Sequence, residues 1–221
     1  MSTSTAPDFY PVVKDLPRVA VAPGATLELL VLAADGHHCA GVDLASGALV
    51  RAWSPSPAEE ALAPYDVAAV TLDVDPDAVP DPAEPEALVL ESPPTKLRRI
   101  KGRKAERLLR PLLHPKGQPL LGISAPAVPF WERRPDHPSI ALVEPEDTVS
   151  LWRDGTYLGC RFGWLGHERE LPCLDRRIAT RMDRAGMTRM LAGRGDRLVV
   201  SLTPPIDGTC HKVVEAVLPR P

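Results

Sequence analysis

Two apolar segments, Thr26-Leu-Glu-Leu-Leu-Val-Leu-Ala-Ala34 and Cys39-Ala-Gly-Val-Asp-Leu44, flank the dipeptide Asp35-Gly36. Short apolar runs on either side of a turn dipeptide are typical of paired β-strands. A second turn at Ser46-Gly47 leads to the alternating segment Ala48-Leu-Val-Arg-Ala-Trp53. This part of the chain therefore predicts three consecutive strands.

The following residues extend this pattern to a small barrel. Ala58-Glu-Glu-Ala-Leu62 predicts one short helical turn, Tyr65 to Val74 a fourth strand and Ala87 to Glu91 a fifth. Three strands, a helix and two further strands is the element order of the five-stranded Greek-key barrel known as the OB fold.

The second half of the chain repeats the same order. Asp175 near the start of an expected helix and Gly193 just past its end are boundary signals. Strands are expected at 139–143 with 148–153, 156–164, 167–173, 196–202 and 209–218, and the helix at 174–191. The predicted fold class is mostly β, with two five-stranded OB-like Greek-key barrels, short helices and a basic connector.

Composition divides the chain into three predicted parts: a first barrel with its lead over 1–92, a basic, Pro-rich connector over 93–130 and a second barrel over 131–221. Residues 104–113 of the connector predict one or two helical turns. Residues 1–95 hold 15 acidic and 3 basic side chains, whereas the rest of the chain holds 14 acidic and 23 basic ones. Such asymmetry indicates a polyanionic partner or two halves that attract each other.

The densest charge follows the first predicted barrel. From Lys96 to Lys116, nine basic residues stand against one acid, Glu106. Lysine and arginine at this density neutralise phosphates and release counterions, so the segment predicts contact with single-stranded or structured nucleic acid. The residues expected to make this contact are Lys96, Arg98, Arg99, Lys101, Arg103, Lys104, Arg107 and Arg110.

Two other interpretations stay open. The basic segment can dock on the acidic first barrel, which would make the protein a protein-interaction or scaffold module. Aromatic residues, on which bases stack, form only 5% of the chain, which weakens the nucleic-acid interpretation. An enzyme that holds an anionic substrate with Arg51 and Lys212 is the third interpretation, but no nucleophile motif accompanies these residues. The expected function is therefore non-enzymatic binding.

No cofactor, metal site or membrane partner is expected. The chain lacks an apolar run long enough to span a bilayer, and its first residues lack the pattern of a signal peptide, so a cytoplasmic location is expected. Histidines and cysteines occur without the two-ligand spacing of a zinc knuckle. The chain has four cysteines, which are expected to be reduced: Cys39, Cys160, Cys173 and Cys210.

Two stretches carry a family resemblance. His38-Cys-Ala-Gly-Val-Asp43 and Gly47-Ala-Leu-Val-Arg-Ala-Trp-Ser54 resemble the "RCxAG" and "GxWxRPVS" strands of the prokaryotic dual OB-containing domain family. Leu49 and Ala52 replace the Trp and Pro that are usual there. The C-terminal run Leu198 to Leu218 is similar to the family ending "LSLGEPFxGxCYKLVAxI".

This resemblance covers nearly the whole chain and implies the double barrel. The C-terminal agreement includes Ser201, Gly208, Cys210 and Lys212, whereas His211 stands where Tyr is usual. The family carries no established activity, so the resemblance implies fold rather than function. The polar residues that it marks as a possible site are Arg51, Asp207 and Lys212.

Overall fold

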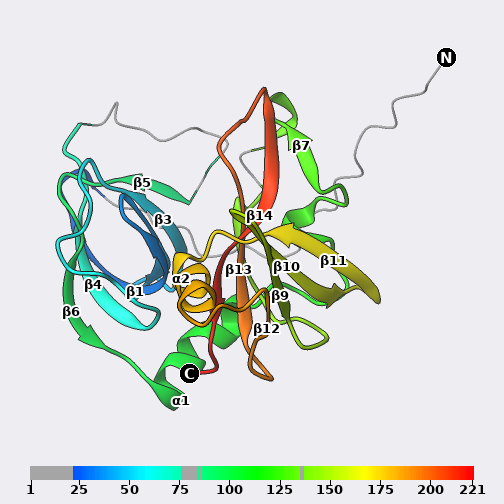
Figure 1. Cartoon of the computed structure of the whole chain (residues 1–221). Helices are drawn as coiled ribbons and strands as arrows, with labels where there is room; N and C mark the ends of the chain where they lie inside the picture. Colours follow the sequence, from blue (N-terminus) through cyan, green and yellow to red (C-terminus); the bar gives the residue numbers. More distant parts are fainter. Residues whose placement is uncertain (1–21, 76–83, 85, 135–136) are drawn as a thin grey trace.

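The computed structural model describes residues 22–75, 84, 86–134 and 137–221. The predicted Pro-rich lead and most of the acidic loop before residue 87 lie outside this part. The protein is mostly β, with three sheets, one of them a curled half-barrel, and two α-helices (Figure 1).

The first half of the chain forms the half-barrel. Its six strands lie in the order β5-β3-β2-β1-β4-β6, with β3 and β5 parallel and every other neighbouring pair antiparallel. A single antiparallel bridge joins Leu72 to Leu90, but the described strands do not pair into a closed barrel. The strands are β1 (Thr26–Asp35), β2 (His38–Asp43), β3 (Leu49–Trp53), β4 (Asp66–Thr71), β5 (Ala87–Val89) and β6 (Thr95–Arg99).

The second half forms two four-stranded sheets, ordered β11-β10-β9-β12 and β7-β14-β13-β8. They face each other across a core that contains Leu151, Phe162 and Trp164 from one sheet and Leu198 and Val214 from the other. The strands are β7 (Ala127–Pro129), β8 (Ile140–Val143), β9 (Ser150–Asp154), β10 (Tyr157–Trp164), β11 (His167–Pro172), β12 (Arg189–Leu191), β13 (Arg197–Leu202) and β14 (Thr209–Leu218).

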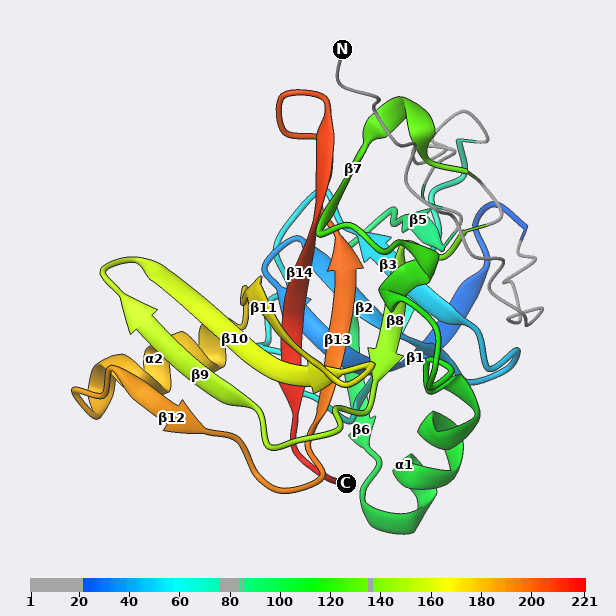
Figure 2. The ribbon, with the colours of Figure 1, turned by 90° about the vertical axis from the view of Figure 1, so that its right-hand side faces the viewer.

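The sheet that contains β13 and β14 is buried on both of its faces (Figure 2). Leu198 and Val200 belong to the core of the second half, whereas Val199 between them packs with Leu30 and Leu32 of β1. A strand covered on both faces need not alternate apolar and polar residues, which explains the consecutive apolar residues Leu198, Val199 and Val200 of β13. The two halves therefore share a core rather than touching at their surfaces.

The helices are α1 (Gly102–Leu109) and α2 (Arg176–Arg184). Ala105 and Leu109 lie one turn apart on α1 and are buried in the core that the halves share. α2 begins at Asp175, whose buried carboxylate accepts hydrogen bonds from the backbone N–H groups of Arg177 and Ile178. Within the described residues, neither helix has the length and apolarity to cross a bilayer.

The strands predicted from turns and apolar runs are confirmed, and so is the helix at Asp175, but its predicted end is wrong. It stops at Arg184, Gly186 follows with a φ of 60°, and the expected helical residues Arg189–Leu191 form β12 instead. Met190 pairs with Leu151 of β9 there, so its side chain is buried by the sheet rather than by a helix.

The helical turn predicted at Ala58 to Leu62 is also wrong, since these residues form no helix. Prolines at 55, 57 and 64 confine the segment, and five residues make too few helical hydrogen bonds to offset nucleation. Leu62 instead anchors the loop in the half-barrel core. The half-barrel consequently has no helix between β3 and β4.

Gly41 of β2 gives a test of this packing. A Cβ atom there would lie 2.7 Å from the backbone oxygen of Leu30 on the neighbouring strand, which cannot move without disturbing the shared core. Gly41→Ala is expected to lower the free energy of unfolding by about 1–3 kcal/mol in urea denaturation. Gly36→Asn in the adjoining turn, where a Cβ meets nothing, is the control and should change it little. Equal stability of G41A and the wild type would contradict this packing.

Candidate functional site

The basic residues of β6 pair with acids of the first half. Lys96 Nζ lies 2.7 Å from Glu60 Oε1 and 3.5 Å from the buried Asp66. Arg98 donates two hydrogen bonds to Glu28, at 3.1 and 2.5 Å. These hydrogen bonds raise the pKa of Lys96 and lower that of Glu28.

Arg99, the third basic residue of β6, donates to the carbonyl of Pro64 at 2.9 Å and lies 3.6 Å from Asp66. Asp66 is opposite Arg99 in the pairing of β4 with β6, so the ladder itself brings this cation to an acid. Three of the eight residues predicted to bind nucleic acid are thus engaged within the chain.

The other five lie on α1 or at its two ends and are exposed. Because α1 turns Ala105 and Leu109 inward, its remaining residues face solvent or the seam between the halves. Glu106, its one acid, is hydrogen-bonded at 2.7 Å to Arg197 of β13, which lowers the pKa of Glu106. In the part of the chain that the structure describes, no acid forms an ion pair with Lys101, Arg103, Lys104, Arg107 or Arg110.

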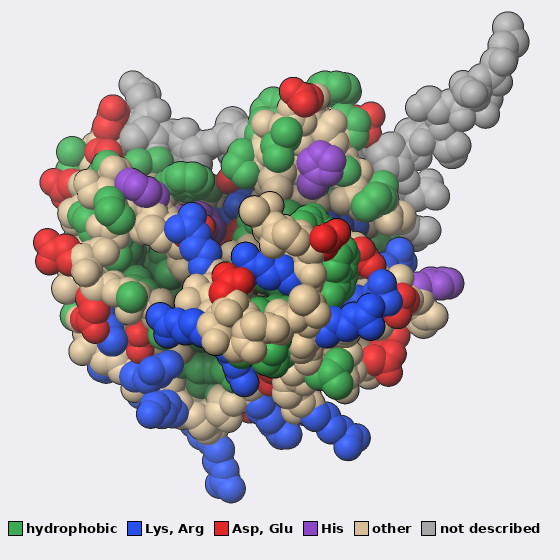
Figure 3. All heavy atoms as spheres, viewed as in Figure 1, with side chains coloured by type: hydrophobic (Ala, Val, Ile, Leu, Met, Phe, Trp, Pro, Cys, Tyr) green, Lys and Arg blue, Asp and Glu red, His purple; other side chains and the backbone are tan. Residues whose placement is uncertain are grey.

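We call these five residues the α1 basic surface. In Figure 3, Lys and Arg side chains gather along the lower part of the molecule, where Figure 1 places α1 and the C-terminus. On the upper left of this view, over the half-barrel, the charged side chains are mostly acidic. The charge asymmetry of the sequence is therefore also an asymmetry of the folded surface.

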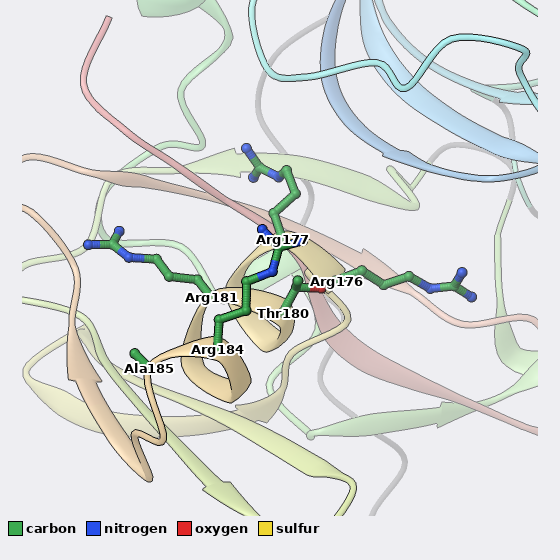
Figure 4. Close-up of a pocket in the computed structure, with 6 residues that line it drawn as sticks. All are labelled: Arg176, Arg177, Thr180, Arg181, Arg184 and Ala185. Atoms are coloured by element: carbon green, nitrogen blue, oxygen red, sulfur yellow. The ribbon is translucent and has the colours of Figure 1, made fainter.

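Sequence reasoning missed the arginines of α2, which line an open hollow of about 560 Å³ (Figure 4). Arg176 reaches Asp35 of β1 at 2.9 Å and Arg177 reaches Asp175 at 2.7 Å. Arg181 and Arg184 are exposed and have no ion pair with the described acids. The nine residues of α2 contain four arginines and one acid, Asp183. This excess of positive charge is the sequence signal that would have predicted a second basic surface.

Arg51 lies at the seam between the halves, in a buried ion-pair cluster. Its guanidinium is 3.3 Å from Glu84 and 3.3 Å from Glu215 of β14, and its own side chain is 4% exposed. Ser201 donates to Glu215 at 2.6 Å. Arg51, Ser201 and Glu215 border a cleft of about 230 Å³. His38 also lines this cleft, and burial lowers its pKa.

Arg51 therefore neutralises two carboxylates that are themselves only 9% exposed. Arg51→Met is expected to cost about 3–5 kcal/mol in the free energy of unfolding, because Glu215 would stay buried without a cation and Glu84 would keep only Arg133, 3.5 Å away. Adding Glu215→Gln should recover part of this loss, which urea denaturation of the single and double variants measures. A loss below about 1 kcal/mol for R51M would show that the cluster is solvated.

The other two residues of the predicted polar site lie elsewhere. Asp207 is exposed on a turn, with a φ of 49°. Lys212 of β14 is buried, lines a separate pocket of about 220 Å³ and donates a hydrogen bond to the carbonyl of Ile123. Burial, followed by the nearby charge of Arg169, lowers the pKa of Lys212 from 10.5 to about 7. The structure thus does not bring Arg51, Asp207 and Lys212 together.

Lys212 gives stability a pH dependence. Between pH 7 and 10.5 its amine is neutral in the folded chain but protonated in the unfolded chain, so the unfolded state binds more protons there. The contribution of Lys212 to the free energy of unfolding should consequently rise with pH across this window. Urea denaturation at several pH values should show a shallower rise for Lys212→Met than for the wild type; parallel curves would contradict the low pKa.

The cysteines are free and buried, as expected for reduced thiols in apolar strands. Burial raises the pKa of Cys39 and of Cys173 to about 12, so these thiols are protonated at neutral pH. Across the described ranges, no group of three or more His, Cys, Asp or Glu residues is arranged to hold a metal ion. The described geometry thus offers basic surfaces and two pockets.

Comparison with known proteins identified no matching family model, curated protein or solved structure.

Proposed function

We propose that this protein is a non-enzymatic module that binds single-stranded or structured nucleic acid through the α1 basic surface. The observation that carries the proposal is that five neighbouring cations are exposed there without a described acid to neutralise them. Contact between such cations and phosphates favours binding because counterions are released from the nucleic acid. A cation that is already paired must first break its ion pair. A cytoplasmic location belongs to the same proposal.

This proposal moves the expected contact from the whole basic segment to one part of it. Lys96, Arg98 and Arg99 have acidic partners in the half-barrel, so their role in it is structural. Arg181 and Arg184 on α2 are further exposed cations that could contact the phosphates of a nucleic-acid strand bound at α1, if the strand continues across the molecule. Phosphate contacts of this kind set affinity and leave sequence preference weak.

We also propose that each half is an OB-like barrel of the dual OB-containing kind. In support, β1, β2 and β3 are consecutive neighbours, β4 pairs with β1, and β5 lies parallel to β3. In the second half β13 pairs with β8, and a parallel bridge joins Cys173, after β11, to Val214 of β14. OB barrels commonly serve as platforms for oligonucleotides.

The test compares two sets of substitutions on short, mixed-sequence, labelled DNA and RNA strands at low and moderate salt. Changing Lys101, Lys104, Arg107 and Arg110 together to Ala should weaken binding to all sequences by about tenfold or more. It should also reduce the salt slope by roughly one for each phosphate that the variant no longer neutralises. The matched control changes Lys96, Arg98 and Arg99 to Ala and should keep near-wild-type affinity.

Absence of salt-sensitive binding at micromolar wild-type protein would overturn the proposal, as would equal losses of affinity in the two sets. The first result would favour the second candidate function, a protein-interaction or scaffold module. The ion pairs of β6 with Glu28, Glu60 and Asp66 are the observation that favours it, since they dock part of the basic segment on its own acidic half.

A further inference from the structure

Lys212 is a buried amine without an acid. The residue is 4% exposed, and its Nζ donates to one backbone carbonyl, that of Ile123. Within the described part of the chain it forms no ion pair. A buried ammonium without a counter-charge carries a large desolvation cost, and the usual outcome is loss of its proton.

The groups around Lys212 leave this cost uncompensated. Arg169 of β11 lines the same pocket, has no ion pair with a described acid, and opposes protonation of the lysine. His114 faces Lys212 from the segment after α1; its ring donates to the carbonyl of Pro119 at 3.0 Å, and burial lowers its pKa. Glu168 and Glu170 also line the pocket but pair with Arg161, at 3.5 and 2.9 Å.

The pocket beside this amine has space for a small molecule. Its volume is about 220 Å³, and Pro119, Leu120 and Trp164 supply apolar walls. Trp164 is fixed by a 2.8 Å hydrogen bond from its indole N–H to the carbonyl of Gln118 and by ring contact with His114. The pocket thus combines a nucleophilic nitrogen, an unpaired guanidinium and apolar surface.

We propose that Lys212 forms an imine with a small carbonyl compound whose anionic group is held by Arg169. The amine nitrogen attacks the carbonyl carbon, a C=N bond replaces C=O, and the carbonyl oxygen leaves as water with the two hydrogens of the amine. Desolvation and a neighbouring cation are the two devices that activate lysine for this chemistry, and both are present here. The lowered pKa of Lys212, about 7, agrees with an amine that is nucleophilic at neutral pH.

The experiment traps the imine in the full-length protein. Glyoxylate, an aldehyde that carries a carboxylate, is added at neutral pH with sodium cyanoborohydride, and peptide mass spectrometry follows the reduced adduct at each of the six lysines. Lys116, whose side chain is 66% exposed and pairs with Glu144, is the internal reference. Lys212 should react at least about tenfold faster than Lys116, with half-maximal rate near pH 7.

Substitution of Arg169 separates the anion contact from the amine chemistry. Arg169→Gln should slow the reaction of Lys212 with glyoxylate several-fold more than its reaction with propanal, a neutral aldehyde, which loses only the effect of Arg169 on the pKa of the lysine. No adduct at Lys212 while Lys116 reacts, or a pH profile at Lys212 that matches that of Lys116, would overturn the proposal. Equal slowing of both aldehydes in R169Q would equally overturn it, because Arg169 would then not select the anion.

Discussion

Burial of the β13–β14 sheet on both faces is the constraint on which the rest of the structure depends. One face, with Leu198 and Val200, closes the core of the second half, and the other, with Val199 and Ala216, lies against the half-barrel. Strand β1 is used in the same way, with Leu29 and Leu30 in different cores. Separating the halves would expose apolar surface on both, so neither half keeps its own packing alone.

Polar contacts at this seam decide how the apolar faces align. Arg51 reaches Glu215, Arg197 reaches Glu106, and the Tyr65 hydroxyl donates to the carbonyl of Pro219. Tyr65 adopts a φ of 72°, a costly conformation for a bulky residue that its buried packing and hydrogen bonds must offset. Apolar surfaces can pack against each other in many relative positions. A buried ion pair or hydrogen bond forms in only one of them, so these contacts specify how the halves fit together.

Local signals in the sequence were sufficient for most strands, because turn dipeptides such as Asp35-Gly36 and Asp154-Gly155 fix where each strand ends. They were insufficient for β6, β7 and β12, of which β7 is a strand through its pairing with β14. Thr95–Arg99 has the composition of a charged linker, and it is a strand only because β4 offers an edge and acids to receive it. Helix α2 ends early because β9 offers Met190 a partner. In each case a neighbour distant in sequence overrides local preference.

The candidate site was predictable in kind but not in position. The sequence identified the basic segment, yet charge density alone cannot tell a cation that will meet an acid from one that will not. A strand in a sheet brings its side chains close to those of nearby strands. The basic side chains of β6 therefore pair with acids of β1 and β4. A surface helix has no such neighbours on its outer side, and α1 keeps its charges exposed.

Arg51 and Lys212, two buried cations that the family resemblance marks alike, also differ in whether acids lie beside them. Arg51 lies 3.3 Å from Glu84 and 3.3 Å from Glu215, so its buried ion pairs link the two halves. Lys212 has a carbonyl and a second cation as neighbours, so its nitrogen gains from losing its proton. Acids thus compensate the charge of Arg51, whereas burial of Lys212 carries an uncompensated desolvation cost, which is the basis of the imine chemistry proposed for this lysine.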